Sequence, residues 1–275
     1  MKPITLSFSP CPNDTFMFDA MIHHKVDTEG LEFEVSYRDI ETLNQQALLG
    51  KPDITKLSSK ALSLVLENYI VLNSGAALGF GVGPLLLSKT PLSHWQSQIS
   101  ELRFGIPGKL TTANFLLDFA FPGPKTKIEM VFSEIEDGLL NDKIDIGLVI
   151  HESRFTYQKR GLNKLLDLGT YWEEKTGLPI PLAGIVVKKT LSHSTQLKIE
   201  RILRKSIAFA FANPHSSLSY VQEHSREMEP EVVQNHIRLY VNEFSLDLGI
   251  RGKVALLTLL KTFDPGLKED SIFLR

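Results

Sequence analysis

The sequence contains a single cysteine, Cys11, among its 275 residues. One cysteine cannot form a disulfide within the chain, so nothing in the sequence requires an oxidising compartment. The longest apolar runs fall far short of the ~20 residues that a membrane-spanning helix needs. The first residues run directly into an expected strand and lack the apolar stretch of a signal peptide. These absences predict a cytoplasmic protein.

An excess of charge of one sign is also missing. Lys and Arg together number 30, Asp and Glu number 32, and the net charge is -2. Proteins that bind nucleic acid or an anionic membrane usually present a basic stripe, and the sequence has none. No group of His, Cys and acidic residues has the spacing of a metal site. We therefore expect a small-molecule ligand, and no nucleic acid, membrane, metal or obligate protein partner.

Short apolar runs alternate with amphipathic helical patterns over the first two-thirds of the chain, which is typical of βαβ units and a mostly parallel sheet. Strands are expected at 4–8, 31–37, 53–57, 69–73, 84–88, 102–106, 128–132, 144–150 and 182–188. Helices are expected between them at 15–25, 41–49, 58–67, 112–120 and 134–141, the last starting at a capping box of the form Ser133-Glu134-Ile135-Glu136. Beyond residue 192 the pattern is all-helical, with helices at 196–212, 216–226, 231–244 and 252–263.

Two segments, 39–58 and 134–148, share an acidic helix start, two leucines, a turn and an Asp-Ile strand. Two similar lobes would produce this repetition, although helix–turn–strand units also converge on it by chance. Glycine and proline concentrate at 79–84 and 177–184, where the hinges between lobes are expected. The pattern predicts an α/β bilobed protein with two mixed sheets flanked by helices, an all-helical tail and a ligand cleft between the lobes. Lobe 1 is expected at 1–86 and 186–275, and lobe 2 at 87–185.

Ligands of open parallel sheets bind beyond the carboxyl ends of the strands. The first such junction, residues 9–15, reads Ser-Pro-Cys-Pro-Asn-Asp-Thr. Its prolines stiffen the backbone, and Asn13, Asp14 or Thr15 can cap a helix that starts at Phe16. A simple helix cap is the alternative to a ligand-binding loop, but a cap alone does not require both prolines.

The second junction is Lys56-Leu57-Ser58-Ser59, where a lysine beside hydroxyl groups suits a carboxylate or a sugar hydroxyl. Capping of a helix by one of the serines is the alternative. The third junction, 106–114, turns through Pro107-Gly108 into a helix whose first N–H groups attract an anion, and Thr111 and Thr112 add donors. It matches neither a phosphate-binding P-loop nor a dinucleotide fingerprint.

The fourth junction follows an apolar strand at 144–150 and reads His151-Glu152-Ser153-Arg154. An imidazole with an unperturbed pKa of ~6.5 can take or give a proton at neutral pH, so His151 is the candidate acid or base. A purely structural histidine is the alternative. Of the other histidines, His23 and His24 end a helix, and the rest are expected in loops or on surface faces of helices: His94, His193, His215, His224 and His236. Cys11 can serve as a nucleophile in principle, but a buried thiol is the commoner outcome.

Together these junctions resemble the 1,4-dihydroxy-6-naphthoate synthases, the cyclic dehypoxanthinyl futalosine lyases of the futalosine route to menaquinone. The residues that carry the resemblance extend over nearly the whole chain: 9–16, 56–58, 81–84, 107–113, 150–157, 172–179 and 240–247. The resemblance implies a fold similar to type II periplasmic binding proteins and a cytoplasmic enzyme that uses no cofactor. It also implies cleavage of a cyclic substrate into 1,4-dihydroxy-6-naphthoate and dihydroxyacetone.

By the same resemblance His151 is the proton acceptor. The implied substrate contacts are Lys56, Leu57, Ser58, Thr112 and Ala113. Further candidates for contact are Thr111, Asn44, Asp14, Arg154 and Tyr157. We expect His151 and the turns that end at Ser58 and Ala113 to face one another across one crevice.

Two alternatives have the same overall pattern. One is a chorismate dehydratase of the same pathway, and the combination of the 9–15 and 151–154 motifs favours the lyase over it. The other is a non-catalytic solute-binding protein. Exported proteins of that kind need a signal peptide or a lipoprotein cysteine after an apolar segment, and no such segment precedes Cys11.

Overall fold

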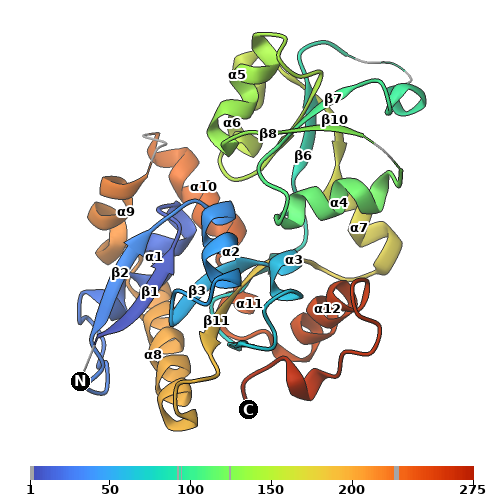
Figure 1. Ribbon diagram of the computed structural model, residues 1–275. Coiled ribbons are helices and arrows are strands. Elements are labelled where there is room, and N and C mark those ends of the chain that lie inside the picture. Colours follow the sequence, from blue (N-terminus) through green and yellow to red (C-terminus); the bar gives the residue numbers. More distant parts are fainter. Residues whose placement is uncertain (1–2, 92, 94, 124, 226–228) are drawn as a thin grey trace. The chain divides into compact units, whose positions relative to one another are not determined.

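The computed structural model describes residues 3–91, 93, 95–123, 125–225 and 229–275 (Figure 1). The chain divides into two compact units, one made of Met1–Gly79 with Pro181–Arg275 and the other of Phe80–Ile180. Both transitions fall within the glycine- and proline-rich stretches at 79–84 and 177–184. Each unit is built around its own mixed sheet, as the sequence predicts.

The sheet of the first unit has the strand order β2-β1-β3-β11-β4, with β5 paired to β11. Strand β1 is parallel to β2 and β3, whereas β11 is antiparallel to β3 and β4. The strands are β1 (Ile4–Phe8), β2 (Phe33–Tyr37), β3 (Ile54–Ser58), β4 (Tyr69–Val71), β5 (Ala77–Gly79) and β11 (Ile180–Lys188). The carboxyl ends of β1, β2 and β3 therefore meet at one edge of this sheet.

Eight helices of the described chain belong to the first unit, and most of them form the C-terminal region, as expected. They are α1 (Pro12–Ile22), α2 (Ile40–Leu48), α3 (Ser59–Leu62), α8 (His193–Ala212), α9 (Leu218–His224), α10 (Pro230–Tyr240), α11 (Glu243–Leu246) and α12 (Gly249–Lys261). Side-chain caps define several starts: Asp39 accepts the Thr42 N–H at 3.0 Å and Ser192 accepts the Thr195 N–H at 3.2 Å.

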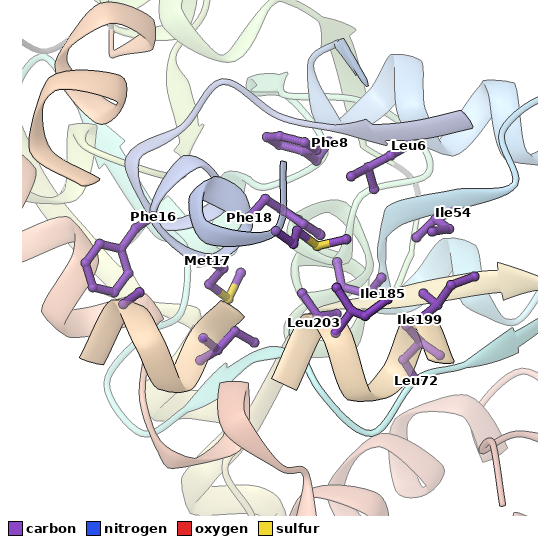
Figure 2. Packing of buried hydrophobic residues seen from close by; sticks show 14 of the residues in the cluster. Leu6, Phe8, Phe16, Met17, Phe18, Ile54, Leu72, Ile185, Ile199 and Leu203 are labelled. Carbon is purple, nitrogen blue, oxygen red and sulfur yellow. The ribbon is translucent and has the colours of Figure 1, made fainter. Parts of the chain in front are cut away.

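The core of the first unit lies between β1, α1, β11 and α8. Figure 2 shows Leu6 and Phe8 of β1 with Phe18 of α1, Ile185 of β11 and Leu203 of α8 in this core. The rings of Phe8 and Phe18 stack with centroids 4.4 Å apart. Burial of each such side chain contributes roughly 1.5–3 kcal/mol. Helix α1 is thereby anchored to the sheet, and its first turn is held at the carboxyl edge.

The second unit has the strand order β10-β6-β9-β7-β8. Its strands are β6 (Leu85–Ser88), β7 (Arg103–Ile106), β8 (Thr126–Glu129), β9 (Ile146–Val149) and β10 (Asn163–Asp167). Strand β7 is parallel to both β8 and β9, and β6 is antiparallel to both β9 and β10. The helices are α4 (Thr112–Ala120), α5 (Ile135–Leu140), α6 (Ser153–Thr156) and α7 (Leu168–Thr176). The carboxyl ends of β7, β8, β9 and β10 thus share one edge.

Several sequence-based expectations about helix boundaries are wrong. Helix α1 begins at Pro12 with Cys11 at its N-cap, so Asn13, Asp14 and Thr15 lie inside its first turn and do not cap it. Proline fits there because its fixed φ suits the first helical position and its missing N–H would have had no helical partner. The expected capping box at Ser133 is replaced by a 3₁₀ turn, Phe132–Glu134, that leads into α5.

Other elements differ in length or were not expected. The helix expected at 58–67 is the short α3, and the one expected at 231–244 divides into α10 and α11. The division occurs at Asn242, which caps α11 by accepting the Phe244 N–H at 3.0 Å. Strands β5 and β10 and helices α6 and α7 have no counterpart among the expected elements. Residue 226, the expected end of the helix that became α9, lies outside the described ranges.

Candidate active site

The carboxyl edge of the first sheet gathers the first two ligand-binding junctions predicted from the sequence. Strands β1 and β3 are parallel neighbours, so the loop after Phe8 and the residues after Ser58 leave the sheet side by side. Helix α1 starts in the first of these connections and α3 starts directly after the second. Helix α2 starts at the same edge, because it follows β2.

Asp14 is the centre of a buried polar cluster at this edge. Its carboxylate accepts the Ser9 hydroxyl at 2.6 Å, the Ser9 N–H at 3.2 Å and the Asn13 amide at 2.8 Å. The ammonium group of Lys56 completes the set with an ion pair to Asp14 Oδ1. The side chain of Asp14 is 0% exposed and that of Lys56 is 5% exposed. The structure therefore joins two candidates that are 42 residues apart in the sequence.

Two further candidates pair beside this cluster. Asn44 of α2 donates its amide to the Ser58 hydroxyl at 3.1 Å, and the Ser58 N–H donates to the amide oxygen of Asn44 at 3.0 Å. Ser58 makes no side-chain cap to α3, so the helix-cap alternative for this junction is wrong. Leu57 is fully buried in β3, so its side chain belongs to the core. The hydroxyl of Ser59 is buried and has no hydrogen-bond partner among the described residues.

His236 is a functional candidate that sequence reasoning missed. The expectation of a surface position for it is wrong, because His236 is 0% exposed. Its Nε2 lies 3.0 Å from the amide oxygen of Asn13, next to Asp14. The available signal was the helical period: Val232 and Tyr240, four residues to either side, are buried on the same face of α10. Of the remaining histidines, His23 ends α1 as expected, and His94 lies outside the described ranges.

The carboxyl edge of the second sheet gathers the other two junctions. Strands β7 and β9 are parallel neighbours, so the turn after Ile106 and the loop after Val149 leave the sheet at the same edge. Thr111 caps α4: its hydroxyl accepts the Asn114 N–H at 3.2 Å and donates to the Gly108 carbonyl at 2.8 Å. Thr112 and Ala113 form the buried first turn of α4. The N-terminus of α4, with its partial positive charge, therefore lies at this edge.

His151 lies two residues after the end of β9 and takes an unusual backbone conformation. Its φ is +58°, in the left-handed region that few residues other than glycine adopt. The imidazole lies against the ring of Phe132, which follows β8 at the same edge, with centroids 4.8 Å apart. Backbone conformations of this kind concentrate at functional sites, where the surrounding structure has to hold them in place. His151 stays the predicted acid or base, and the structure places it at the carboxyl edge of this sheet.

The side chain of Arg154 forms hydrogen bonds within the protein. Its guanidinium donates to the Asp167 carboxylate at 2.6 Å and to the Gly83 carbonyl at 2.5 Å. The other oxygen of Asp167 caps α7 by accepting the Gly169 N–H at 2.9 Å. The chain turns back from His151 into α6, with the Arg154 N–H 3.3 Å from the His151 carbonyl. Arg154 thus ties the His151 loop to the start of β6 and to α7.

Gly83 and Gly169 form a close approach of two backbones beside this arginine. A Cβ atom on Gly83 would lie 2.2 Å from the Cα of Gly169, which leaves no room for a side chain. Nearby, the Gly81 N–H donates to the Glu173 carboxylate at 2.7 Å, and burial raises the pKa of that carboxyl. The segment at 81–83 is therefore held against α7 by Glu173 and Gly169. Arg154 of α6 adds a link from Gly83 to Asp167, the residue that caps α7.

Replacement of Gly83 by alanine is expected to lower the free energy of unfolding by about 1–3 kcal/mol, because the added methyl group overpacks a backbone contact. Urea unfolding followed by circular dichroism measures the change. Gly184→Ala is the matched control, since its Cβ would meet its nearest neighbour, a methyl of Leu62, at an ordinary 3.5 Å. Equal stability of Gly83→Ala and the parent protein would contradict the close approach.

The predicted site residues thus form one group in each unit. Asp14, Asn44, Lys56, Leu57 and Ser58 lie at or next to the carboxyl edge of the first sheet, and Thr111, Thr112, Ala113, His151 and Arg154 lie at that of the second. Within the described ranges, no cluster of three or more His, Cys, Asp and Glu residues is arranged to hold a metal ion. None of the helices described is both long and apolar enough to cross a membrane.

Comparisons with known proteins point to one family. A family model described as menaquinone biosynthesis matches residues 4–264. A curated protein of Thermus thermophilus, named 1,4-dihydroxy-6-naphthoate synthase, is 41% identical over 93% of this chain and 92% of its own length. A Streptomyces coelicolor protein of the same name is 39% identical over 94% of this chain and 91% of its own length.

Solved structures extend the comparison to the fold. A protein of Archaeoglobus fulgidus is 35% identical, with a TM-score of 0.88 over 96% of this chain and 98% of that one. A Candida albicans gene product, described as having the generic periplasmic binding protein fold, is 13% identical with a TM-score of 0.68 over 98% of this chain and 93% of that one. The second likeness shows that this chain has the same fold.

Proposed function

The chain belongs to the menaquinone biosynthesis family, and on that premise we propose that it is a 1,4-dihydroxy-6-naphthoate synthase. The reaction is the cleavage of cyclic dehypoxanthinyl futalosine into 1,4-dihydroxy-6-naphthoate and dihydroxyacetone, which makes the enzyme a carbon–carbon lyase. The observation that carries the proposal is the match, over more than nine-tenths of both chains, to two relatives of that name. The site geometry supports it by supplying the groups that such a reaction needs.

The proposed mechanism begins with proton abstraction by His151. Elimination followed by carbon–carbon cleavage needs a base to remove a proton and donors to stabilise oxygen atoms as negative charge develops. The imidazole of His151 can accept the proton, and Phe132 limits the freedom of its ring. The first turn of α4, at Thr112 and Ala113, offers backbone N–H groups and a positive helix terminus to an oxygen of the substrate.

At the first sheet, Lys56 and Ser58 are the proposed contacts to hydroxyl or carboxylate groups of the substrate. An ammonium group has three protons, and Asp14 takes one of them, so Lys56 keeps donors for a ligand. Asn44 holds Ser58 in place through two hydrogen bonds. Asp14 and Asn44 therefore act by positioning these two side chains, and Arg154 acts likewise for the His151 loop.

Incubation of the purified protein with cyclic dehypoxanthinyl futalosine and, separately, with chorismate tests the proposal directly. We expect mass spectrometry to find 1,4-dihydroxy-6-naphthoate and dihydroxyacetone in equal amounts from the first compound and no change in the second. Dehydration of chorismate would instead identify a chorismate dehydratase of the same pathway. Tight binding of either compound without turnover would identify a solute-binding protein.

Two finer parts of the proposal have their own tests. We propose that no cofactor takes part, so protein that has been unfolded, dialysed with a chelator and refolded in plain buffer should form product at the parent rate. We also propose a cytoplasmic location. A chain with one cysteine forms no internal disulfide and so does not depend on an oxidising compartment. Cell fractionation followed by detection of the protein with a specific antibody tests that location.

A further inference from the structure

A buried histidine from the C-terminal region completes the polar cluster at the first sheet. His236 of α10 lies more than 200 residues after Asn13 in the sequence, yet its Nε2 is 3.0 Å from the Asn13 amide oxygen. Both residues are at most 2% exposed. The ring also packs against Tyr240, one turn further along α10, with centroids 4.7 Å apart. The imidazole is therefore fixed in place by its own helix and directed at the first turn of α1.

The contacts determine which atoms carry hydrogen. The Asn13 amide nitrogen is 2.8 Å from the Asp14 carboxylate, which can only accept, so the nitrogen faces Asp14 and the oxygen faces His236. An amide oxygen also only accepts hydrogen bonds, so Nε2 of His236 must be the donor. The chain of donors runs from His236 to Asn13, from Asn13 to Asp14, and Asp14 pairs with Lys56.

We propose that His236 is a positioning residue for the substrate contact made by Lys56, an inference that rests on the proposed function. Without a donor at Nε2, the Asn13 amide oxygen loses the contact that holds this side chain in place. The amide can then move away from Asp14, which weakens its hydrogen bond to Oδ1, and the carboxylate and the ammonium group of Lys56 shift together. Deeply buried networks of this kind are sensitive to the loss of any member.

The two oxygens of the Asp14 carboxylate have different partners, so loss of the Asn13 hydrogen bond acts on only one of them. The Ser9 hydroxyl and N–H both bind Oδ2, whereas Asn13 and Lys56 both bind Oδ1. Loss of the Asn13 contact therefore leaves Oδ2 anchored and lets the carboxylate rotate about that anchor. The displaced atom is the one that Lys56 contacts. His236 should accordingly affect substrate binding more than it affects the chemical step at His151.

A matched pair of amide variants separates positioning from packing. In His236→Gln the side-chain nitrogen reaches nearly the place of Nε2, whereas in His236→Asn it falls near the place of Nδ1. We expect His236→Asn to raise KM for cyclic dehypoxanthinyl futalosine about tenfold with kcat reduced less than about threefold, the size of one lost hydrogen bond in a charged network. His236→Gln should restore most of the affinity, and His193→Leu, at an exposed histidine, should change neither constant.

A double-mutant cycle with Asn13→Ala provides the second measurement. If His236 acts through Asn13, His236→Asn should raise KM little in the Asn13→Ala background, because the side chain that links His236 to Asp14 is already absent. Additive effects of the two substitutions would overturn the proposal. A His236→Asn variant with an unchanged KM and a lower melting temperature would also overturn it, because His236 would then contribute only to packing.

The nitrogen resonances of the His236 ring test the arrangement without any assay. Proton–nitrogen correlation spectra should show Nε2 protonated, and a ring protonated only at Nδ1 would contradict the chain of donors. Failure of the proposed function looks different. The parent protein would then leave cyclic dehypoxanthinyl futalosine unchanged. Failure of the His236 role alone leaves the parent protein active, with the KM of His236→Asn either unchanged or altered independently of Asn13.

Discussion

Replacement of His151 by alanine is expected to lower kcat by about 10²–10⁴-fold or more, which is the contribution of a well-placed general base. Binding of cyclic dehypoxanthinyl futalosine should remain measurable by calorimetry, because the proposed binding groups, Lys56, Ser58 and the first turn of α4, are unchanged. The direct measurement is steady-state turnover followed by release of 1,4-dihydroxy-6-naphthoate. A variant with the parent rate would remove His151 from the mechanism.

His151→Gly is the companion variant, and it separates conformation from chemistry. Since the residue sits at φ +58°, glycine fits the backbone better than alanine, and the glycine variant should be more stable by roughly 1 kcal/mol. Both variants lack the base, so both should be inactive. Added imidazole should restore part of the turnover in the glycine variant, which has the larger vacated space. His215→Ala, at an exposed histidine, is the activity control.

Removal of one partner of the Asp14–Lys56 pair has the second-largest expected effect. Asp14→Ala leaves a buried ammonium group without its counter-charge, which should lower the free energy of unfolding by about 3–5 kcal/mol. Urea unfolding measures this change. The paired replacement Asp14→Leu with Lys56→Met should recover part of the stability, since it removes the unpaired buried charge. Recovery should be incomplete, because the donors of Ser9 and Asn13 lose their acceptor.

In the double variant, substrate affinity should not recover together with stability, and this difference separates the binding role of Lys56 from its structural role. The stable double variant still lacks the ammonium group, so its affinity for cyclic dehypoxanthinyl futalosine should stay low although the fold is restored. The Lys89–Asp142 pair, with side chains 43% and 75% exposed, is the control. Asp142→Asn should cost about 1 kcal/mol or less and leave affinity unchanged. A double variant that binds substrate normally would assign the pair a structural role only.

The parts of the fold that the sequence predicts well are those with a strong local pattern. The apolar strand at 144–150 and the helix at 112–120 both appear close to their expected bounds, as β9 and α4. Strand β10 was missed because Asn163–Asp167 is polar at both ends and its pairing with β6 is irregular. Helix α7 was missed although Asp167 caps it, because the apolar period over 168–176 is weak.

The candidate site follows the same rule. His151 could be selected because it directly follows a buried strand, and its place at a carboxyl edge depends only on local order. The pairing of Asp14 with Lys56 could not be predicted, since it depends on the register between β1 and β3. The burial of His236 could have been inferred from the period of its helix, but its partner, Asn13, could not, because Asn13 belongs to a helix at the other end of the chain. Contacts across long sequence separations leave no trace in a local pattern.

The order of strands in the first sheet has a consequence for synthesis on the ribosome. Strand β11 lies between β3 and β4, so the pairing of strands in this sheet cannot be completed until residue 188 has left the exit tunnel. Residues 80–180 are made in the meantime, a delay on the order of ten seconds at typical rates of elongation. During that interval β1, β2 and β3 are nascent chain with an unpaired edge. The second unit, residues 80–180, can therefore fold before the N-terminal part of the first unit does.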